Sequence, residues 1–507
     1  MIVRGRDLAR DVVLDVDAVV VGTGAGGSVA LRELARAGLK VLALEEGGHH
    51  TSSDFDQRED RMLPLLFQDG GGRATRDMAI RVLQGRGVGG STVHNTNLCK
   101  RTPDEILDLW KAHYQVTGAS PLEMKPAFER IETDLSVRPM LPEWRNGNNN
   151  ALRRGVEALG LRGGMLQHNR VGCQQSGFCE LGCSYDAKQN ALKVMIPQAL
   201  GAGADVYSDV TAQRIVVSDG RARGVVGVAT DADGAPRASV TVRAKVTVLA
   251  GSAVGSAALG IGSGLPDPHG TLGKGLRLHP GGVVAGLFDR EINGAEGIPQ
   301  SYECTELLSF EEKSDRRVWI IPAFAHPIGT AASLPGFGAP HMKAMRGYNR
   351  LAVLTAMVHD ETSGTVSLDA DGRPSLVYEM SPSDRAQLAK GLVLCARILF
   401  AAGAREVTIP AIPPVILTSP AALDGLEPRL ARPHGVPLAS VHPMGTMRMG
   451  DDPRTSVVSS TGEHHQVKGL FVADGSLFPT SIGVPPQISI YSFALHLAPG
   501  IVQAARG

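Results

Sequence analysis

The sequence has no net charge of either sign. Lys and Arg together number 51, and Asp and Glu also number 51. A balanced chain produces no global field that would attract nucleic acid or an anionic membrane surface. We therefore expect no nucleic-acid partner.

Long apolar runs are also missing. No uninterrupted run reaches the roughly 20 residues that a membrane-spanning helix requires, so we expect no membrane span. Residues 1–17 mix charges with short apolar pieces and lack the continuous apolar segment of a secretory signal. This pattern predicts, by default, a cytoplasmic protein.

Cysteine is rare, with six residues in the chain, and Cys173, Cys179 and Cys183 lie close together. In a cytosolic protein such a cluster indicates a metal site, a redox site or buried thiols before it indicates disulfides. Its spacing fits neither the common zinc frameworks nor the usual ferredoxin run. We therefore expect buried thiols or one disulfide in a glycine-rich loop, and no metal ion. The other cysteines are Cys99, Cys304 and Cys395.

Aromatic residues make up only 4% of the chain, whereas glycine is abundant, with 61 residues. Many glycines permit tight turns and close approaches of the backbone, which nucleotide-binding folds need. Apolar residues at 43% and charged residues at 20% are ordinary for a globular protein. The 507 residues exceed one ordinary core, so we expect two domains or one large composite unit.

A strand–helix–strand pattern stands near the start of the chain. Val19–Val21 and Val41–Leu44 are short apolar runs typical of buried parallel strands, and Ser28–Ala37 has apolar residues at helical spacing. Between them, Gly22–Gly27 fits the G-x-G-x-x-G pattern, whose glycines let a pyrophosphate approach the first helical turn. Glu45 ends the second strand, at the spacing expected for an acid that binds ribose hydroxyls. The pattern predicts a dinucleotide site, for NAD or FAD.

A second glycine turn, with Arg86, Gly87, Gly89 and Gly90, is more than a single NAD fold needs. We find no internal repeat and no flexible linker, so the sequence determines domain boundaries only weakly. Strands are predicted at residues 206–210, 224–229, 240–249, 318–321 and 351–358, and a long helix at 383–402.

Five motif-bearing segments follow one another along nearly the whole chain: Val41–Gly47, Gly85–Asn95, Ala250–Ser256 with Ser263–Leu265, His442–Gly450, and Gly469–Ser476. In this order they resemble the glucose–methanol–choline (GMC) oxidoreductase family. The second segment resembles the signature that wraps the flavin, and the fourth resembles the active-site segment. The third departs from the family pattern, because Ala257 stands where proline is usual.

The resemblance implies an α/β fold and FAD as cofactor. It implies a Rossmann-type FAD-binding domain from separated segments (residues 1–110, 190–285 and 435–507). It also implies a substrate-binding domain (111–189 and 286–434) with a mainly antiparallel sheet and helices. The expected FAD contacts are Gly22, Gly24, Ala25, Gly26, Gly27, Glu45, Glu46, Arg86, Gly89, Gly90, Ser91, His94, Asn95, Val210, Ala250, Gly251, Asp474, Gly475, Pro485, Pro486 and Gln487.

The implied reaction is oxidation of an alcohol to a carbonyl. The flavin N5 accepts a hydride, and the protein supplies a base near the hydroxyl. His442 lies in the active-site segment, and an imidazole titrates in the right range, so His442 is the expected base. His279, before Pro280, is expected to have a structural role. The histidines that match no catalytic position are His434, His464, His465 and His496.

The expected active site departs from the family pattern at one position. The family usually places a second His or Asn opposite the base, whereas this chain has Pro485 there. Proline has no side-chain donor and no backbone N–H. Either His442 acts alone or another polar group replaces the missing partner. Four classes stay open: an FAD-dependent alcohol oxidoreductase, a redox-neutral lyase or photodecarboxylase on the same fold, a nicotinamide dehydrogenase, and an inactive flavin-binding protein.

Two further resemblances bear on the cofactor and the substrate. His94 stands where some relatives carry a histidine bonded covalently to the flavin, so we expect a covalent link there. The segment from Cys173 to Lys188 resembles that of members acting on sterols, long-chain alcohols or sugar acids, which favours a hydrophobic alcohol. O2 or another electron acceptor would reoxidise the flavin. The sequence leaves the oligomeric state open.

Overall fold

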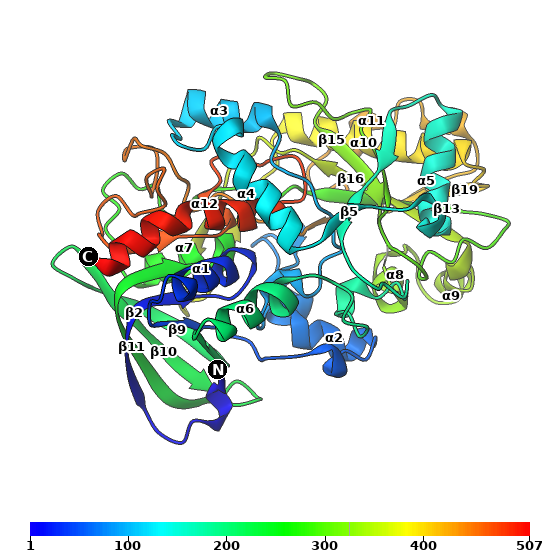
Figure 1. The fold of residues 1–507 in the computed structure, drawn as a ribbon. Coiled ribbons are helices and arrows are strands. Elements are labelled where there is room, and N and C mark those ends of the chain that lie inside the picture. Colours follow the sequence, from blue (N-terminus) through cyan, green and yellow to red (C-terminus); the bar gives the residue numbers. More distant parts are fainter. Residues whose placement is uncertain (324) are drawn as a thin grey trace.

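The computed structural model describes residues 1–323 and 325–507 and shows a mixed α/β protein (Figure 1). Two large sheets lie in different parts of the molecule. The first sheet is on the left of Figure 1, near both chain ends, and the second is on the right. The predicted class, a Rossmann-type part beside a part with a mainly antiparallel sheet, is confirmed.

The first sheet has eight strands and a parallel centre. In it, β2 (Val12–Val21) pairs in parallel with β3 (Val41–Leu44) and β11 (Pro236–Leu249). β3 is buried along its whole length, as an uninterrupted apolar run requires. β2 is longer than the predicted Val19–Val21, because its first half is a partly exposed extension beside β11. The other strands are β1 (Ile2–Arg4), β8 (Asp205–Ser208), β9 (Val210–Ser218), β10 (Arg221–Thr230) and β22 (Leu470–Val472).

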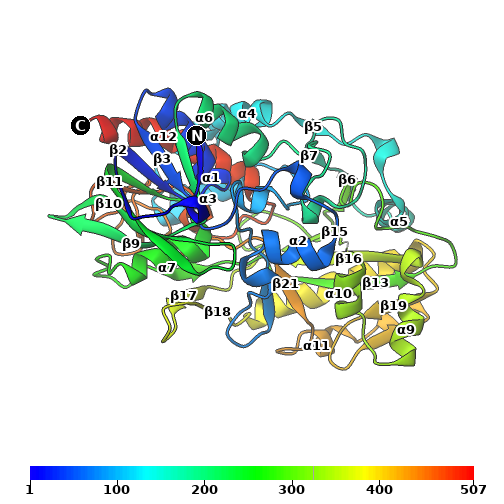
Figure 2. The same ribbon diagram turned by 90° about the horizontal axis from the view of Figure 1, so that it is seen from below.

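The second sheet has nine strands and is antiparallel except where β21 (Leu438–Ser440) pairs with β4 (Ile80–Val82). Its central pair is β13 (Gly281–Leu287) and β16 (Leu351–Val358), which pack against α10 (Pro382–Ala401). Seen from below, this sheet and α10 lie opposite the first sheet (Figure 2). The remaining strands are β6 (Gly163–Met165), β14 (Tyr302–Cys304), β15 (Val318–Pro322), β19 (Glu406–Ile409) and β20 (Val415–Leu417).

The predicted division into two domains stays a prediction. The strands β4, β13 and β21 belong to the second sheet, although the predicted ranges placed residues 80–82, 281–285 and 438–440 with the first sheet. Smaller sheets join β12 (Lys274–Leu276), β17 (Gly364–Leu368) and β18 (Pro374–Val377), and β5 (Val137–Pro139) with β7 (Gln167–Asn169).

Helix α12 (Gln487–Arg506) is the C-terminal element, and it packs against α1 (Ala25–Arg36), α4 (Pro121–Asp134) and β11. By length and composition α12 could cross a membrane, and 56% of its most apolar window is buried inside the molecule. No uninterrupted apolar run occurs here, because polar residues such as Ser489 and His496 interrupt the helix, and the expected lack of a membrane span stays a prediction. The contacts are those of a core helix.

The remaining α-helices include two that cover the sheets, α5 (Gly147–Ala158) against α10 and α7 (Ser252–Gly262) against β9. The others are α2 (Glu59–Leu66), α3 (Asp104–Tyr114), α6 (Ile196–Gly201), α8 (Pro327–Ser333), α9 (Ala339–Met345) and α11 (Glu427–Leu430).

All six cysteines, each in the described part of the chain, are free thiols. The expectation of buried thiols or a disulfide is corrected for Cys173, Cys179 and Cys183, which are unpaired and only half-buried. Their loop is irregular and partly open to solvent, which explains the exposure. No group of three His, Cys, Asp or Glu side chains in residues 1–323 and 325–507 is placed to hold a metal ion, and the absence of a metal stays a prediction.

Candidate active site

The first glycine motif forms the turn between β2 and α1. The helix begins at Ala25, and its N-cap residue is Gly24, which has no side chain that could cap the N-terminus. The first-turn N–H groups have no acceptor within the helix, and the helix end carries a partial positive charge, so both features suit a pyrophosphate. Gly26 has to be glycine, because a Cβ there would overlap the carbonyl oxygen of Ala473. The backbone therefore comes unusually close at this turn.

The second glycine turn lies directly against the first. Gly90 has a φ of +53°, and a Cβ on it would lie 2.9 Å from the Cα of Gly24. The N–H of Gly89 donates to Thr23 Oγ1 at 3.1 Å. Two turns that are far apart in sequence thus form one cradle walled by backbone, and this cradle fits the diphosphate of FAD.

Glu45 joins the loops around this cradle. One carboxylate oxygen accepts from the N–H and the hydroxyl of Thr23, at 3.0 and 2.7 Å. The other accepts from the N–H groups of Gly47 and Gly87, each at 3.1 Å. Burial, followed by repulsion from Glu46, raises the pKa of Glu45 to about 7. Glu45 is therefore a structural cross-link, and its binding of ribose stays a prediction. Val210 lies beside it, donating its N–H to the Glu45 carbonyl oxygen at 2.9 Å.

The structure brings together predicted cofactor residues from distant segments. The Asn95 amide donates to Gln487 Oε1 at 2.9 Å, which joins the second glycine turn to the start of α12. The buried carboxylate of Asp474 accepts from the Ser256 hydroxyl at 2.6 Å and from the Ser476 N–H at 2.8 Å. Burial raises the pKa of Asp474. Three of the five family-like segments therefore meet beside the cradle.

Some predicted cofactor residues lie further out. Ser91 is exposed, and Glu46 and Arg86 are half-buried. An Arg86 nitrogen lies 3.4 Å from the Glu46 carbonyl oxygen. Pro485 and Pro486 are buried in the loop that leads into α12. The contacts of all these residues with FAD stay predictions.

His94 is buried beside the cradle. Its ring centroid lies 3.9 Å from that of Phe67. Its Nε2 is buried and has no hydrogen-bond partner among the described residues. Burial, together with the positive charge of Lys188, lowers the pKa of His94 to about 3, so the ring is neutral. A neutral ring nitrogen without a partner is free to bond a cofactor atom.

Lys188 is a residue whose role the sequence did not reveal. It is 2% exposed, and its ammonium donates to the carbonyl oxygens of Val93 and Cys179, each at 2.8 Å, and to that of Asn95. Burial lowers the pKa of Lys188 to about 8. The side chain thus ties both carbonyls that flank His94 to the cysteine segment. A lysine is usually a surface residue, and only its place in that segment could have drawn attention to it.

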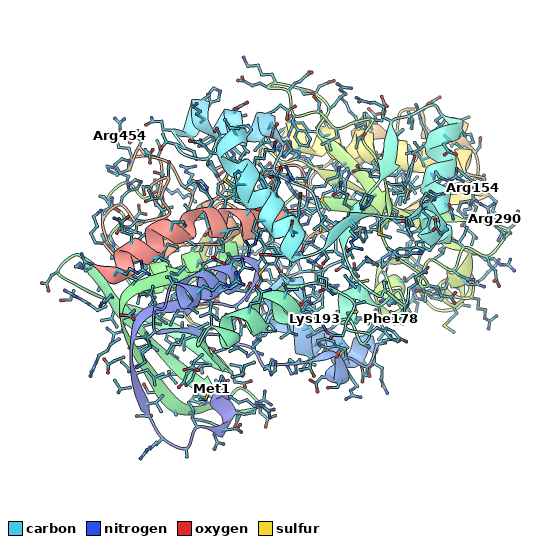
Figure 3. All side chains as sticks on the ribbon, viewed as in Figure 1. Met1, Arg154, Phe178, Lys193, Arg290 and Arg454 are labelled. Atoms are coloured by element: carbon cyan, nitrogen blue, oxygen red, sulfur yellow. The ribbon has the colours of Figure 1, made fainter. Side chains whose placement is uncertain are left out.

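The cysteine segment surrounds a small pocket of its own. Cys173, Cys179, Cys183 and Lys188 line it. Phe178, labelled in Figure 3, stacks on His326 with ring centroids 4.2 Å apart. The segment therefore connects the His94 turn to the start of α8.

One end of the second sheet gathers three histidines. Gly281 of β13 pairs with Met357 of β16 and with Ala439 of β21. β16 and β21 flank β13 and each runs antiparallel to it, so the residues after β16 and β21 meet those before β13 at one edge. These residues are His279, His359 and His442.

His279 and His442 are in direct contact. Their Nδ1 atoms lie 3.2 Å apart, and their rings are nearly perpendicular. The ring of His359 is 6.3 Å from that of His279, centroid to centroid. Burial lowers the pKa of all three histidines below the ordinary value, so they are neutral at pH 7. The ring of His279 is the hydrogen-bonding partner of His442, and the structural role expected of His279 stays a prediction.

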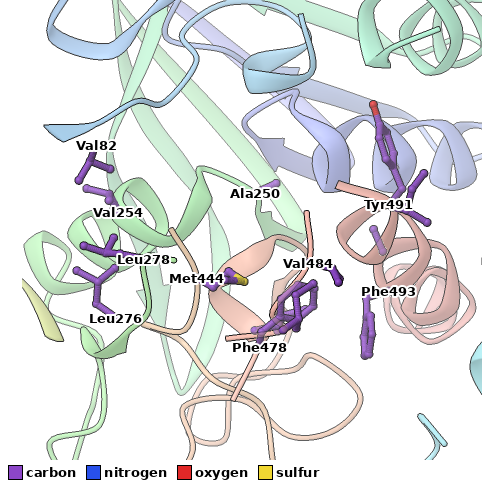
Figure 4. Packing of buried hydrophobic residues seen from close by; sticks show 14 of the residues in the cluster. Val82, Ala250, Val254, Leu276, Leu278, Met444, Phe478, Val484, Tyr491 and Phe493 are labelled. Carbon is purple, nitrogen blue, oxygen red and sulfur yellow. The ribbon is translucent and has the colours of Figure 1, made fainter. Parts of the chain in front are cut away.

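The segment after His442 runs alongside the cofactor residues. The N–H of Gly445 donates to the Gly475 carbonyl oxygen at 3.0 Å. Leu278 and Met444, which adjoin the two histidines, belong to one buried apolar cluster with Phe478 and Val484 (Figure 4). The histidine pair is therefore linked, through this segment, to the turn that carries Asp474. The four other histidines named from the sequence do not join the pair of His279 and His442. His434 is exposed, His464 is buried, and His465 and His496 are half-buried.

Comparison with known proteins gives the family. The family model for GMC oxidoreductases matches residues 63–281 with its N-terminal part and 360–494 with its C-terminal part. A GMC-type oxidoreductase of Mycobacterium tuberculosis is 35% identical over 95% of this chain and 75% of its own length. A long-chain-alcohol oxidase of Arabidopsis thaliana is 30% identical over 96% of this chain and 67% of its own. The crystal structure of pyridoxine 4-oxidase from Mesorbium loti has a TM-score of 0.71 at 17% identity, covering 96% of this chain and 98% of that one, which shows the same fold.

Proposed function

The chain belongs to the GMC oxidoreductase family, and from that premise we propose that it oxidises an alcohol to a carbonyl, with FAD as hydride acceptor and His442 as the base. The chain is an FAD-dependent oxidoreductase, and bound FAD supplies the two-electron chemistry. The two glycine turns, Asp474 and the pair of Asn95 and Gln487 would hold it.

The observation that carries the proposal is the contact between His442 and His279. A base has to be neutral before it accepts a proton, and burial keeps both rings neutral at pH 7. His279 gives His442 a polar neighbour, whereas Pro485 offers no side-chain donor. The named alcohol-oxidising relatives favour alcohol oxidation over the redox-neutral alternatives.

We propose a hydrophobic alcohol as substrate and O2 as electron acceptor. The support is the relative from Arabidopsis thaliana, which is named a long-chain-alcohol oxidase and matches nearly the whole of this chain. We further propose that the flavin is attached through His94, whose Nε2 is buried and has no partner in the described chain.

The test is replacement of His442 by Ala. The rate of flavin reduction is measured by anaerobic rapid mixing with a long-chain primary alcohol. It should fall by roughly 10²–10⁴-fold, the usual effect of losing a positioned base. FAD occupancy should not change, since His442 is not part of the cradle. His496→Ala, which removes a half-buried histidine of α12, is the control and should reduce at the wild-type rate. Near wild-type reduction by a fully flavinylated His442→Ala protein would refute the base assignment.

A further inference from the structure

The two ring nitrogens of His279 have different partners. The backbone N–H of Gly483 donates to Nε2 at 2.9 Å. On the other side, Nδ1 of His279 lies 3.2 Å from Nδ1 of His442. His279 thus stands between a backbone donor and the proposed base.

The partners determine where the ring hydrogens lie. A backbone N–H can only donate, so Nε2 of His279 accepts and carries no hydrogen. A neutral imidazole has one ring hydrogen, and that of His279 is therefore on Nδ1. It donates to Nδ1 of His442, and the hydrogen of His442 is consequently on Nε2.

The surroundings hold this arrangement in place. Asp360 accepts from the backbone N–H of His279 at 3.1 Å, which fixes the residue from behind. On the Gly483 side, the Ser481 hydroxyl donates to the Asp360 carbonyl oxygen at 2.8 Å, and the Ser481 carbonyl oxygen lies 3.1 Å from Nε2 of His359. His279, whose ring accepts the bond, and the loop that carries the Gly483 N–H are therefore both anchored to Asp360.

We propose that His279 is a positioning residue that sets the tautomer of His442, and that the N–H of Gly483 selects which tautomer it is. With hydrogen on Nε2, His442 can donate to a substrate oxygen at that nitrogen but cannot accept a proton there. The catalytic consequence rests on the proposed function.

His442 becomes a base at Nε2 only when the ring hydrogens of the pair reverse. Its hydrogen then lies on Nδ1 and is donated to Nδ1 of His279, whose own hydrogen moves to Nε2. That hydrogen would oppose the N–H of Gly483. The base form therefore requires the bond between Gly483 and His279 to open, so the loop that leads into α12 controls when His442 can take the hydroxyl proton.

Nitrogen-15 NMR of histidine-labelled holoenzyme tests the tautomers directly and needs no substrate. Signals are assigned by comparison with His279→Gln and His442→Gln proteins. In the wild-type protein we expect hydrogen on Nδ1 of His279 and on Nε2 of His442. Hydrogen on Nδ1 of His442 would overturn the proposal, whatever the variants do.

Two substitutions separate the two contacts of His279. Asn places an amide near the Nδ1 position, where it can donate or accept, and it loses the contact with Gly483. Gln places an amide near the Nε2 position, so it keeps that contact but leaves Nδ1 of His442 without a partner. His279→Asn should shift His442 toward hydrogen on Nδ1 and reduce the flavin at least as fast as the wild-type protein, whereas His279→Gln should reduce it more slowly.

Slower flavin reduction by the folded His279→Asn protein than by the His279→Gln protein would overturn the proposal, because the variant that lacks the Gly483 contact would then be the less active one. The outcome is distinguishable from a failure of the proposed function. If NMR gives the expected tautomers but His442→Ala keeps the wild-type rate, His442 is not the base and the tautomer assignment stands.

Discussion

Replacing Lys188 with Met is expected to destabilise the protein and to displace His94. The substitution keeps the approximate size of the side chain but removes the ammonium that donates to the carbonyl oxygens of Val93, Asn95 and Cys179. These carbonyls would remain buried without that donor. The turn that carries His94 would then lose its attachment to the cysteine segment.

The size of the destabilisation caused by Lys188→Met follows from two opposing contributions. Leaving a buried polar group unsatisfied costs about 1–3 kcal/mol, so three carbonyls cost about 3–9 kcal/mol. Removing the ammonium relieves the cost of its burial. The pKa of Lys188, about 8, against an ordinary value of about 10.4, corresponds to about 3 kcal/mol. We expect the free energy of unfolding to fall by about 3 kcal/mol, the middle of the resulting range.

Urea unfolding at pH 8 measures this loss, with Lys193→Met as the matched control. Lys193, labelled in Figure 3, is exposed and pairs with Asp186. An exposed pair of this kind contributes about 0–1 kcal/mol. The flavin that stays with acid-precipitated protein gives a second readout, which should fall for Lys188→Met and not for the control.

The pH dependence adds an independent check. Because the pKa of Lys188 is lower in the folded protein, the unfolded chain binds the extra proton above pH 8, and the stability contributed by this residue rises with pH. The difference in stability between the wild-type and Lys188→Met proteins should therefore widen from pH 8 toward pH 10. Equal stability of the Lys188→Met and Lys193→Met proteins, with equal retention of flavin, would refute this account of Lys188.

Other outcomes concern the cofactor and the base. Wild-type protein precipitated with acid should keep its yellow colour in the pellet, and His94→Ala should release all of its FAD; free FAD from the wild type would contradict the covalent link. Gly26→Ala should lack the flavin absorbance of the wild type while keeping a folded far-UV spectrum, since its Cβ would collide with Ala473. Burial lowers the pKa of His442 well below its ordinary value, so flavin reduction should stay constant as the pH falls through about 6.5 and slow only at lower pH. A rate that halves near pH 6.5 would contradict that pKa, and stability should be followed in parallel, because histidines buried as neutral rings destabilise the fold as the pH falls.

The sequence determined the features that repeat over short distances. The runs at Val41–Leu44 and at residues 351–358 became β3 and β16 with the predicted bounds, and residues 383–402 became α10, shifted by one residue. Each follows from local periodicity, since burial on both faces of a strand or on one face of a helix leaves a regular apolar pattern. The glycine motif was also predicted, because the turn between β2 and α1 is local, although Gly26 is required by the distant carbonyl of Ala473.

The sequence alone underestimated elements whose pattern depends on distant partners. The first half of β2 is interrupted by Asp15 and is only partly buried, and it extends the predicted strand by pairing with β11. In the same way, β4 and β21 are too short to be predicted, and they form by pairing with each other. Strand formation at such positions is decided by tertiary hydrogen bonds rather than by propensity.

The contacts that define the site were decided by the tertiary structure alone. His279 and His442 are 163 residues apart in sequence, and Asn95 and Gln487 are 392 apart. The sequence named His442, Asn95 and Gln487, but it gave His279 a structural role and Lys188 none. A side chain's partners are set by how strands and loops from distant segments meet, and nothing in the local pattern around a histidine or a lysine records which donor or acceptor will face it in the fold.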